Sequence, residues 1–231
     1  MRNTKLILCL FLIPIGFGQL SHAQDWAGLN RFRDENASLG LPANGEKRIV
    51  FMGNSITEFW KNIRPDFFTG KPYIDRGISG QTSPQMLLRF REDVINLKPA
   101  VVLIMAGIND IAGNTGPSTL EMIEDNIISM AQLAWANGIR TILCSVLPAF
   151  DFPWNPGAMP AEKIVALNKM IKDYADQNGI IYLDYYSSMA DSRKGLKADY
   201  SEDGVHPNVA GYKVMEPLAE AAITRALLLK K

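Results

Sequence analysis

Between residues 48 and 228 the sequence alternates short apolar runs with longer segments of helical spacing. The five apolar runs are KRIVFMG, PYIDRGI, AVVLIMAG, IRTILCSV and IIYLDY. AVVLIMAG is apolar throughout, which is typical of a parallel strand covered on both faces. In the helical segments apolar residues recur three and four positions apart, as they do in SPQMLLRFREDVINL. This alternation predicts a parallel sheet with helices on both faces.

The number of apolar runs predicts the fold class. About five parallel strands favour a three-layer α/β/α, flavodoxin-like fold with strand order 2-1-3-4-5. No linker divides the pattern, so we expect a single domain over residues 24–231. In such sheets ligands bind at the carboxyl ends of the strands. Residues that follow the apolar runs are therefore the candidates for function.

The N-terminus has the three-part layout of a secretory signal peptide. MRNTK carries two positive charges, LILCLFLIPIGFG is a short apolar run, and SHA ends in a small residue. We expect cleavage after Ala23, which makes residues 1–23 the leader and the protein exported, periplasmic or extracellular. An uncleaved membrane anchor is the alternative, but the apolar run is too short and too interrupted to span a bilayer. No stable membrane insertion is expected after cleavage.

Cleavage would change the charge balance of the chain. Of the 24 Lys and Arg residues, Arg2 and Lys5 leave with the leader, so 22 remain against 24 Asp and Glu. The remaining chain has no basic stripe for a phosphate backbone, so a nucleic-acid partner is not expected. Cys144 becomes the one cysteine, which excludes an internal disulfide and is simplest as a small buried apolar residue.

Cleavage also leaves a single histidine, because His22 lies in the leader and His206 is the other one. One histidine and one cysteine cannot form a zinc site with nitrogen or sulfur ligands. The chain also lacks the glycine motifs of dinucleotide and P-loop sites. We therefore expect neither a metal nor a cofactor.

The stretch FMGNSITEF, residues 51–59, ends an apolar run at a glycine and places a lone serine after it. Ser55 has two interpretations. With Glu58 three positions later it forms the S-x-x-E pattern of a helix capping box. Alternatively, a serine at the end of the first strand is a candidate nucleophile. Taken alone, the local pattern favours the cap.

Residues at the ends of the other strands change that balance. Gly80 lies in GISGQT, Asn109 in GIND, and Asp203 and His206 in DGVHPN. His206 is suited to take a proton from Ser55, and Asp203 to orient its imidazole. The N–H groups of Ser55 and Gly80 and the amide of Asn109 are suited to an oxyanion hole. Singly, each residue is also explained as a turn, cap or helix-entry residue.

The four blocks GNS, GISGQT, GIND and DGVHPN, in this order across residues 48–228, resemble those of the SGNH hydrolases, also called GDSL-like lipases and acylhydrolases. The segments RGISGQTSPQMLLRF and LKPAVVLIMAGIND look most like the platelet-activating-factor acetylhydrolase and carbohydrate acetylesterase branch. The resemblance implies the SGNH-hydrolase fold, the catalytic triad Ser55, Asp203 and His206, and the oxyanion donors named above. One departure is Asn54, where the family usually has Asp.

The expected function is therefore a secreted serine esterase acting on short-chain, O-acetyl esters of carbohydrates. A lysophospholipase or general short-chain arylesterase is the alternative, and a non-catalytic glycan-binding protein is a more remote one. The loop 148–160, with Phe150, Phe152 and Trp154, either walls the pocket or packs as a lid on the protein itself. The expected partner is a small-molecule or glycan ester, and the oligomeric state stays open.

Overall fold

The computed structural model describes residues 25–229, so the predicted leader lies outside the described residues. Five parallel strands form one sheet in the order β2-β1-β3-β4-β5. In chain order they are β1 (Ile49–Gly53), β2 (Tyr73–Gly77), β3 (Val101–Ile104), β4 (Arg140–Cys144) and β5 (Ile181–Leu183). The predicted fold class and strand order are confirmed.

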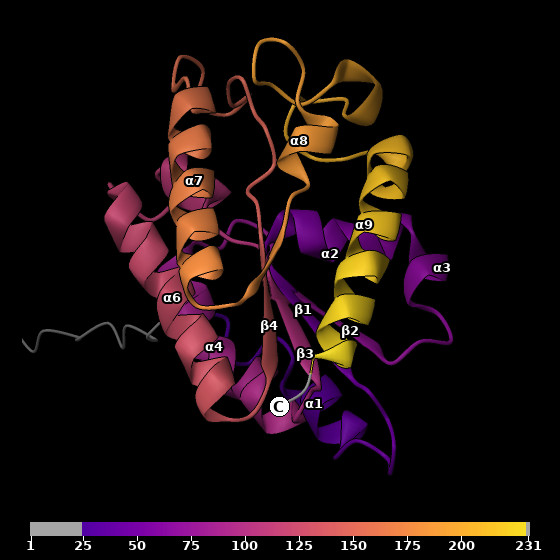
Figure 1. Ribbon diagram of the computed structural model, residues 1–231. Helices are drawn as coiled ribbons and strands as arrows, with labels where there is room; N and C mark the ends of the chain where they lie inside the picture. The colour runs from indigo at the N-terminus through magenta and orange to yellow at the C-terminus, as the bar shows by residue number, and fades with distance from the viewer. Residues whose placement is uncertain (1–24, 230–231) are drawn as a thin grey trace, which may run out of the picture.

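Helices cover both faces of the sheet (Figure 1). α2 (Ser55–Ile63) and α9 (Val209–Leu228) lie on one face, and α4 (Ser83–Asp93), α6 (Leu120–Ala136) and α7 (Ala161–Gln177) lie on the other. The shorter elements are α1 (Arg33–Leu39), α3 (Pro65–Phe68), α5 (Ile108–Ile111), α8 (Tyr186–Met189) and the 3₁₀ turns Ile95–Leu97 and Ala198–Tyr200. Within residues 25–229 no helix is long and apolar enough to cross a membrane.

The central strands lie in the core, since every residue of β1 and β3 is buried. This agrees with their unbroken apolar sequences, because both faces of a parallel sheet are covered. Cys144 is buried at the end of β4, as predicted for an apolar role. The carboxyl ends of the strands meet at one edge of the sheet. The loop after β4 and the loop before α9 project together from that end of the molecule (Figure 1).

An aromatic cluster anchors α2 against α9 and the sheet. The Trp60 ring stacks at 5.0 Å on Phe67 and at 5.5 Å on Tyr212 of α9. The Tyr212 hydroxyl donates a 2.8 Å hydrogen bond to the carbonyl of Ile56. Because Ile56 is the neighbour of Ser55, these contacts hold the first turn of α2 in a fixed place at the end of β1.

Candidate active site

The junction of β1 and α2 places Ser55 at the first residue of the helix and makes Asn54 its N-cap. Asn54 is buried, and its Oδ1 accepts a 3.3 Å hydrogen bond from the N–H of Ile56. The capping interpretation of Ser55 is therefore excluded, because the residue before it fills that position. Asn and Asp are both good caps, so Asn54 fills the capping position without a charge beside Ser55.

Glu58 does not complete a capping box either. Its Oε2 accepts hydrogen bonds from Ser79, from the N–H at 2.8 Å and from the side-chain hydroxyl. Glu58 thus binds the loop that follows β2, where Gly80 lies. The S-x-x-E pattern is real in the sequence, but its acidic residue contacts a different segment of the chain.

Ser55, His206 and Asp203 lie in a hydrogen-bonded row. Ser55 Oγ is 3.0 Å from His206 Nε2, and His206 Nδ1 is 2.7 Å from Asp203 Oδ2. With Nδ1 protonated and donating to the carboxylate, Nε2 is free to accept the serine proton. The fold thus brings together three side chains from the two ends of the domain, 151 residues apart in the case of Ser55 and His206.

Asp203 is held by its own loop. Its Oδ1 accepts hydrogen bonds from the N–H groups of Val205 and His206 at 2.9 and 2.8 Å, and from the Ser201 hydroxyl at 3.1 Å. Partial burial would raise the pKa of Asp203. The hydrogen bonds from the His206 side chain and from the two backbone N–H groups outweigh burial and lower that pKa to about 2. The carboxylate therefore stays charged at neutral pH.

Gly80 lies in the loop after β2, and Asn109 lies in α5, which follows β3. Gly80 has a φ of 77°, a conformation that favours glycine over residues with a side chain. No acceptor within residues 25–229 pairs with its N–H. Asn109 is buried, and its Nδ2 donates a 2.9 Å hydrogen bond to the carbonyl of Gln81, next to Gly80. An amide nitrogen carries two protons, so one remains for a ligand.

Asp110 and Arg89 take part in this arrangement, although sequence reasoning assigned them no role. Asp110 accepts hydrogen bonds from the N–H of Ser83 at 2.9 Å and from its hydroxyl at 2.6 Å, which ties α5 to the start of α4. Arg89 is fully buried and donates to the carbonyl of Gly53 at 2.9 Å. Both residues fix backbone beside the candidate site, and nothing in the sequence pattern distinguished them from surface charges.

The described residues contain no group of three or more His, Cys, Asp or Glu side chains that could hold a metal ion. The hydroxyl, imidazole and carboxylate in a row, beside backbone and amide donors, are instead the groups that acyl transfer to a serine requires.

Comparison with known proteins decides the family. Residues 51–214 match the GDSL-like lipase/acylhydrolase family. The chain belongs to this family. The resemblance predicted from the four sequence blocks is thereby confirmed.

Solved structures of this family from two Bacteroides species are similar over most of the chain. A candidate acylhydrolase from Bacteroides fragilis is 54% identical, with a TM-score of 0.87 over 88% of this chain and 99% of its own. A GDSL-like lipase from Bacteroides thetaiotaomicron is 52% identical, with a TM-score of 0.84 over 87% of this chain and 100% of its own.

A curated relative is named for its substrate. An acetylxylan esterase from Xylanibacter ruminicola is 26% identical over 96% of this chain, and the match covers 53% of that protein. The chain spans about half the length of two curated relatives that it matches.

Two aromatic rings lie near the imidazole of this GDSL-family protein. The Phe59 ring of α2 lies 5.3 Å from the His206 ring, and the Trp154 ring of the loop 148–160 lies 6.1 Å from it. Phe59 comes four residues after Ser55, so the two share one side of α2. That spacing was a usable sequence signal, whereas nothing local showed that Trp154 would reach His206.

The loop 148–160 combines both predicted roles. Phe152 is buried and packs into the core, as a lid residue would. Trp154 stacks on Phe152 at 5.2 Å between ring centres and keeps 47% of its surface exposed. The buried ring therefore supports an exposed aromatic face beside His206.

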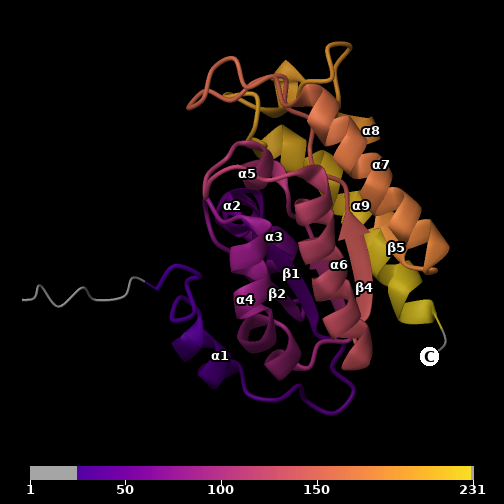
Figure 2. The same ribbon diagram turned by 90° about the vertical axis from the view of Figure 1, so that its left-hand side faces the viewer.

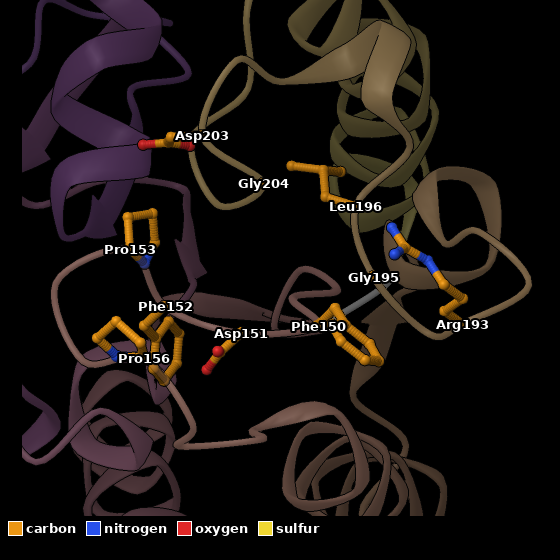
Figure 3. Close-up of a pocket in the computed structure, with 10 residues that line it drawn as sticks. All are labelled: Phe150, Asp151, Phe152, Pro153, Pro156, Arg193, Gly195, Leu196, Asp203 and Gly204. Atoms are coloured by element: carbon orange, nitrogen blue, oxygen red, sulfur yellow. The ribbon is translucent and has the colours of Figure 1, made fainter.

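A pocket of about 310 Å³ opens between this loop and the segment that leads to Asp203 (Figure 3). Asp203 lies at one end of it, and Phe150 and Arg193 lie at the other (Figure 3). The guanidinium carbon of Arg193 is 5.0 Å from the centre of the Phe150 ring. The pocket thus offers aromatic, cationic and acidic groups next to the candidate site.

Proposed function

We propose that this protein is a serine esterase that hydrolyses short-chain carboxylic esters, chiefly O-acetyl groups on carbohydrates. The observation that carries the proposal is the row in which Ser55 Oγ is 3.0 Å from His206 Nε2 and His206 Nδ1 is 2.7 Å from Asp203. Membership of an acylhydrolase family supports the same class of reaction.

In the first half-reaction Ser55 Oγ attacks the ester carbonyl carbon while His206 Nε2 takes the hydroxyl proton. The carbonyl electrons move to the oxygen, which the N–H groups of Ser55 and Gly80 and the amide of Asn109 stabilise. The bond to the leaving alcohol then breaks, and His206 returns its proton to the alcohol oxygen. The product is an acyl group on Ser55.

In the second half-reaction a water molecule attacks the acyl carbon and gives one proton to His206. Collapse of this second tetrahedral intermediate breaks the bond to Ser55 Oγ, which takes the proton back from His206. The carboxylic acid leaves, and the resting enzyme is restored. Asp203, with its pKa lowered to about 2, stays ionised and stabilises the imidazolium in both halves.

The surroundings of His206 support a carbohydrate as the alcohol part of the ester. The exposed face of Trp154, backed by Phe152, suits the apolar face of a sugar ring. The neighbouring pocket adds Asp151 and Arg193, which suit hydroxyl groups better than an alkyl tail. The acetylxylan esterase relative is consistent with acetyl as the acyl group.

We also propose that the protein is exported, with residues 1–23 removed. The support is the charged, apolar and small-residue order of MRNTK, LILCLFLIPIGFG and SHA. Sequencing the N-terminus of the protein recovered outside the cytoplasm should give Gln24 as the first residue. A mature chain that begins at Met1 would contradict the proposal.

The reaction class is tested with p-nitrophenyl acetate and the variants Ser55→Ala and His206→Ala. Both should lose activity by a factor of about 10⁶, since the serine and histidine of such a unit act together. Ser38→Ala, a serine exposed on α1, is the matched control and should keep wild-type activity. Undiminished hydrolysis by either site variant would overturn the triad.

The substrate is tested by measuring acetate released from a panel of acetylated oligosaccharides, beside p-nitrophenyl acetate and octanoate. We expect acetyl esters to be preferred and Trp154→Ala to weaken oligosaccharide hydrolysis more than p-nitrophenyl acetate hydrolysis. A preference for octanoate would favour the lysophospholipase alternative. Binding of the oligosaccharides without release of acetate would favour a glycan-binding protein.

A further inference from the structure

Gln81, the residue after Gly80, joins three separate parts of the chain. Its side-chain Nε2 donates a 2.6 Å hydrogen bond to the carbonyl of Ala27, and its Oε1 accepts one of 2.6 Å from Arg89 Nε. Its backbone carbonyl accepts the 2.9 Å hydrogen bond from Asn109 Nδ2. Because the side chain is buried, these bonds are shielded from water. Gln81 therefore links an N-terminal segment to the amide of Asn109.

That N-terminal segment, residues 25–32, is here called the strap. It lies beside α4 in Figure 2, where it is the indigo segment before α1. Asp25 closes its turn by accepting hydrogen bonds from the N–H groups of Leu29 and Asn30, both at 2.8 Å. Ala27 and Phe32 are buried against the domain. The strap is thus packed against the rest of the fold.

The strap fits closely against the loop of residues 78–82, here called the oxyanion loop. Gly28 has a φ of 69°, and a Cβ built on it would lie 3.1 Å from Gln81 Nε2 and from Ile78 Cδ1. A side chain at this position would therefore push on the oxyanion loop as well as strain the strap. The close approach explains why residue 28 is a glycine, which no pattern in the sequence indicated.

Two further contacts hold the ends of the oxyanion loop. Gln85 Nε2 donates a 2.5 Å hydrogen bond to the carbonyl of Trp26, while its Oε1 accepts from the N–H of Thr82 at 3.0 Å. At the other end Arg31 lies 3.6 Å from Glu58, whose carboxylate binds Ser79. The strap thus contacts the centre of the oxyanion loop directly at Gln81 and is joined to its two ends through Gln85 and Glu58.

None of these contacts reaches the serine, histidine and aspartate row. Asp203 and His206 are held by their own loop, and Ser55 by the start of α2. Loosening the strap would therefore disturb the Gly80 and Asn109 donors to the oxyanion and leave the nucleophile and base in place. Donors stabilise the transition state only when they are fixed in advance, so the catalytic step would slow. Binding of the substrate before reaction would change little, because its ester group is still planar and carries no oxyanion.

We propose that the strap sets the catalytic rate by fixing the oxyanion loop, with Gln81 as the positioning residue between them. The inference rests on the proposed function, because it takes Gly80 and Asn109 as the oxyanion donors. It adds a segment outside the four sequence blocks to the parts on which turnover depends.

The variant Gln81→Glu distinguishes the hydrogen bond to the strap from the hydrogen bond to Arg89. A glutamate has nearly the same shape and still accepts from Arg89, but it cannot donate to the carbonyl of Ala27. We expect kcat on p-nitrophenyl acetate to fall about 10- to 100-fold, which is less than the loss of a whole donor, while KM stays within about twofold. The inhibition constant of phenylboronic acid, which forms a tetrahedral adduct with a reactive serine, should rise in parallel.

Asp25→Ala tests the strap without touching the loop. Asp25 is exposed, so this variant should fold even if Gln81→Glu does not. It should lower kcat about two- to fivefold with the same rise in the phenylboronic acid constant. Asp184→Ala is the matched control, because Asp184 is also exposed and also accepts a backbone N–H, from Ser187 at 2.9 Å. It should leave kcat unchanged.

Wild-type kcat and phenylboronic acid inhibition in Asp25→Ala, and in Gln81→Glu if it folds, would overturn the role of the strap. A fall in kcat caused only by partial unfolding would also overturn it, and active-site titration with a fluorophosphonate detects that case. Failure of the proposed function gives a different result, since wild-type protein would then show no hydrolysis that depends on Ser55.

Discussion

Asp203 and His206 lie on one loop, and the bonds that hold them come from residues 201–206 of the same loop. The oxyanion loop is held in the opposite way, by partners as distant in the chain as Ala27, Glu58 and Asn109. One half of the candidate site is therefore built locally, and the other is built by the fold as a whole. Changes in the local half should alter chemistry with little effect on folding, whereas the dispersed half couples rate to distant packing.

Asp203→Asn is the strongest test of the local half. An asparagine cannot carry the charge that stabilises the imidazolium, and it favours the wrong histidine tautomer. We expect kcat to fall about 10⁴-fold, with KM and the melting temperature nearly unchanged, as measured by steady-state kinetics and thermal unfolding. A loss below tenfold would mean that Asp203 does not orient His206.

Asn109→Ala tests the half of the site that is held by distant partners, because it removes the Asn109 amide as a donor. We expect kcat to fall about 10²- to 10³-fold with little change in KM, because one donor to the oxyanion is lost. Asn126→Ala is the matched control, since Asn126 is a half-buried amide that binds Ser83 at 3.1 Å at the start of α4. If both variants lose the same activity, the effect of Asn109 is structural and not that of a donor.

The pH dependence should distinguish the two halves. kcat/KM should rise with pH on the acidic side, because His206 must be neutral to act as base. Asp203, with its pKa lowered to about 2, adds no second step above pH 4. Asn109→Ala should lower the profile without moving its midpoint. A flat wild-type profile from pH 5 to 8 would contradict the role of His206.

Substitution of Asp75 in β2 should have the smallest effect of these changes, and it should alter stability without altering activity. Burial raises its pKa to about 7, against the lowering effects of the Gly77 N–H, Lys61 and Arg76, and its Oδ2 has no partner among the described residues. Since the unfolded pKa is near 3.8, wild-type stability should fall as pH rises from about 4 to 7.

Asp75→Asn removes this titration. Its free energy of unfolding should exceed that of wild type at pH 8 by about 1–3 kcal/mol, and the gain should shrink toward pH 4. Denaturant unfolding at the two pH values measures this, and kcat should not change. An equal difference at both pH values would show that Asp75 does not titrate with folding.

The same contrast explains what the sequence could predict. The strands follow from apolar runs, and the contact between Asp203 and His206 follows from a spacing of three residues. The bond from Gln81 to Ala27 joins residues 54 apart and involves a glutamine with no distinguishing local pattern. Likewise, Trp154 lies near His206 while stacked on the buried Phe152, a contact between residues 52 positions apart in the chain. The cap at Asn54 was missed because Ser55 offered a better-known pattern one position later.

His206 is the one histidine outside the predicted leader, and its Nδ1 lies 2.7 Å from Asp203. The proton NMR spectrum of the processed protein should therefore contain a single set of imidazole ring signals. It should also contain one far-downfield N–H resonance from this hydrogen bond. Both would report on the state of the base during titration or inhibitor binding without isotope labelling or resonance assignment.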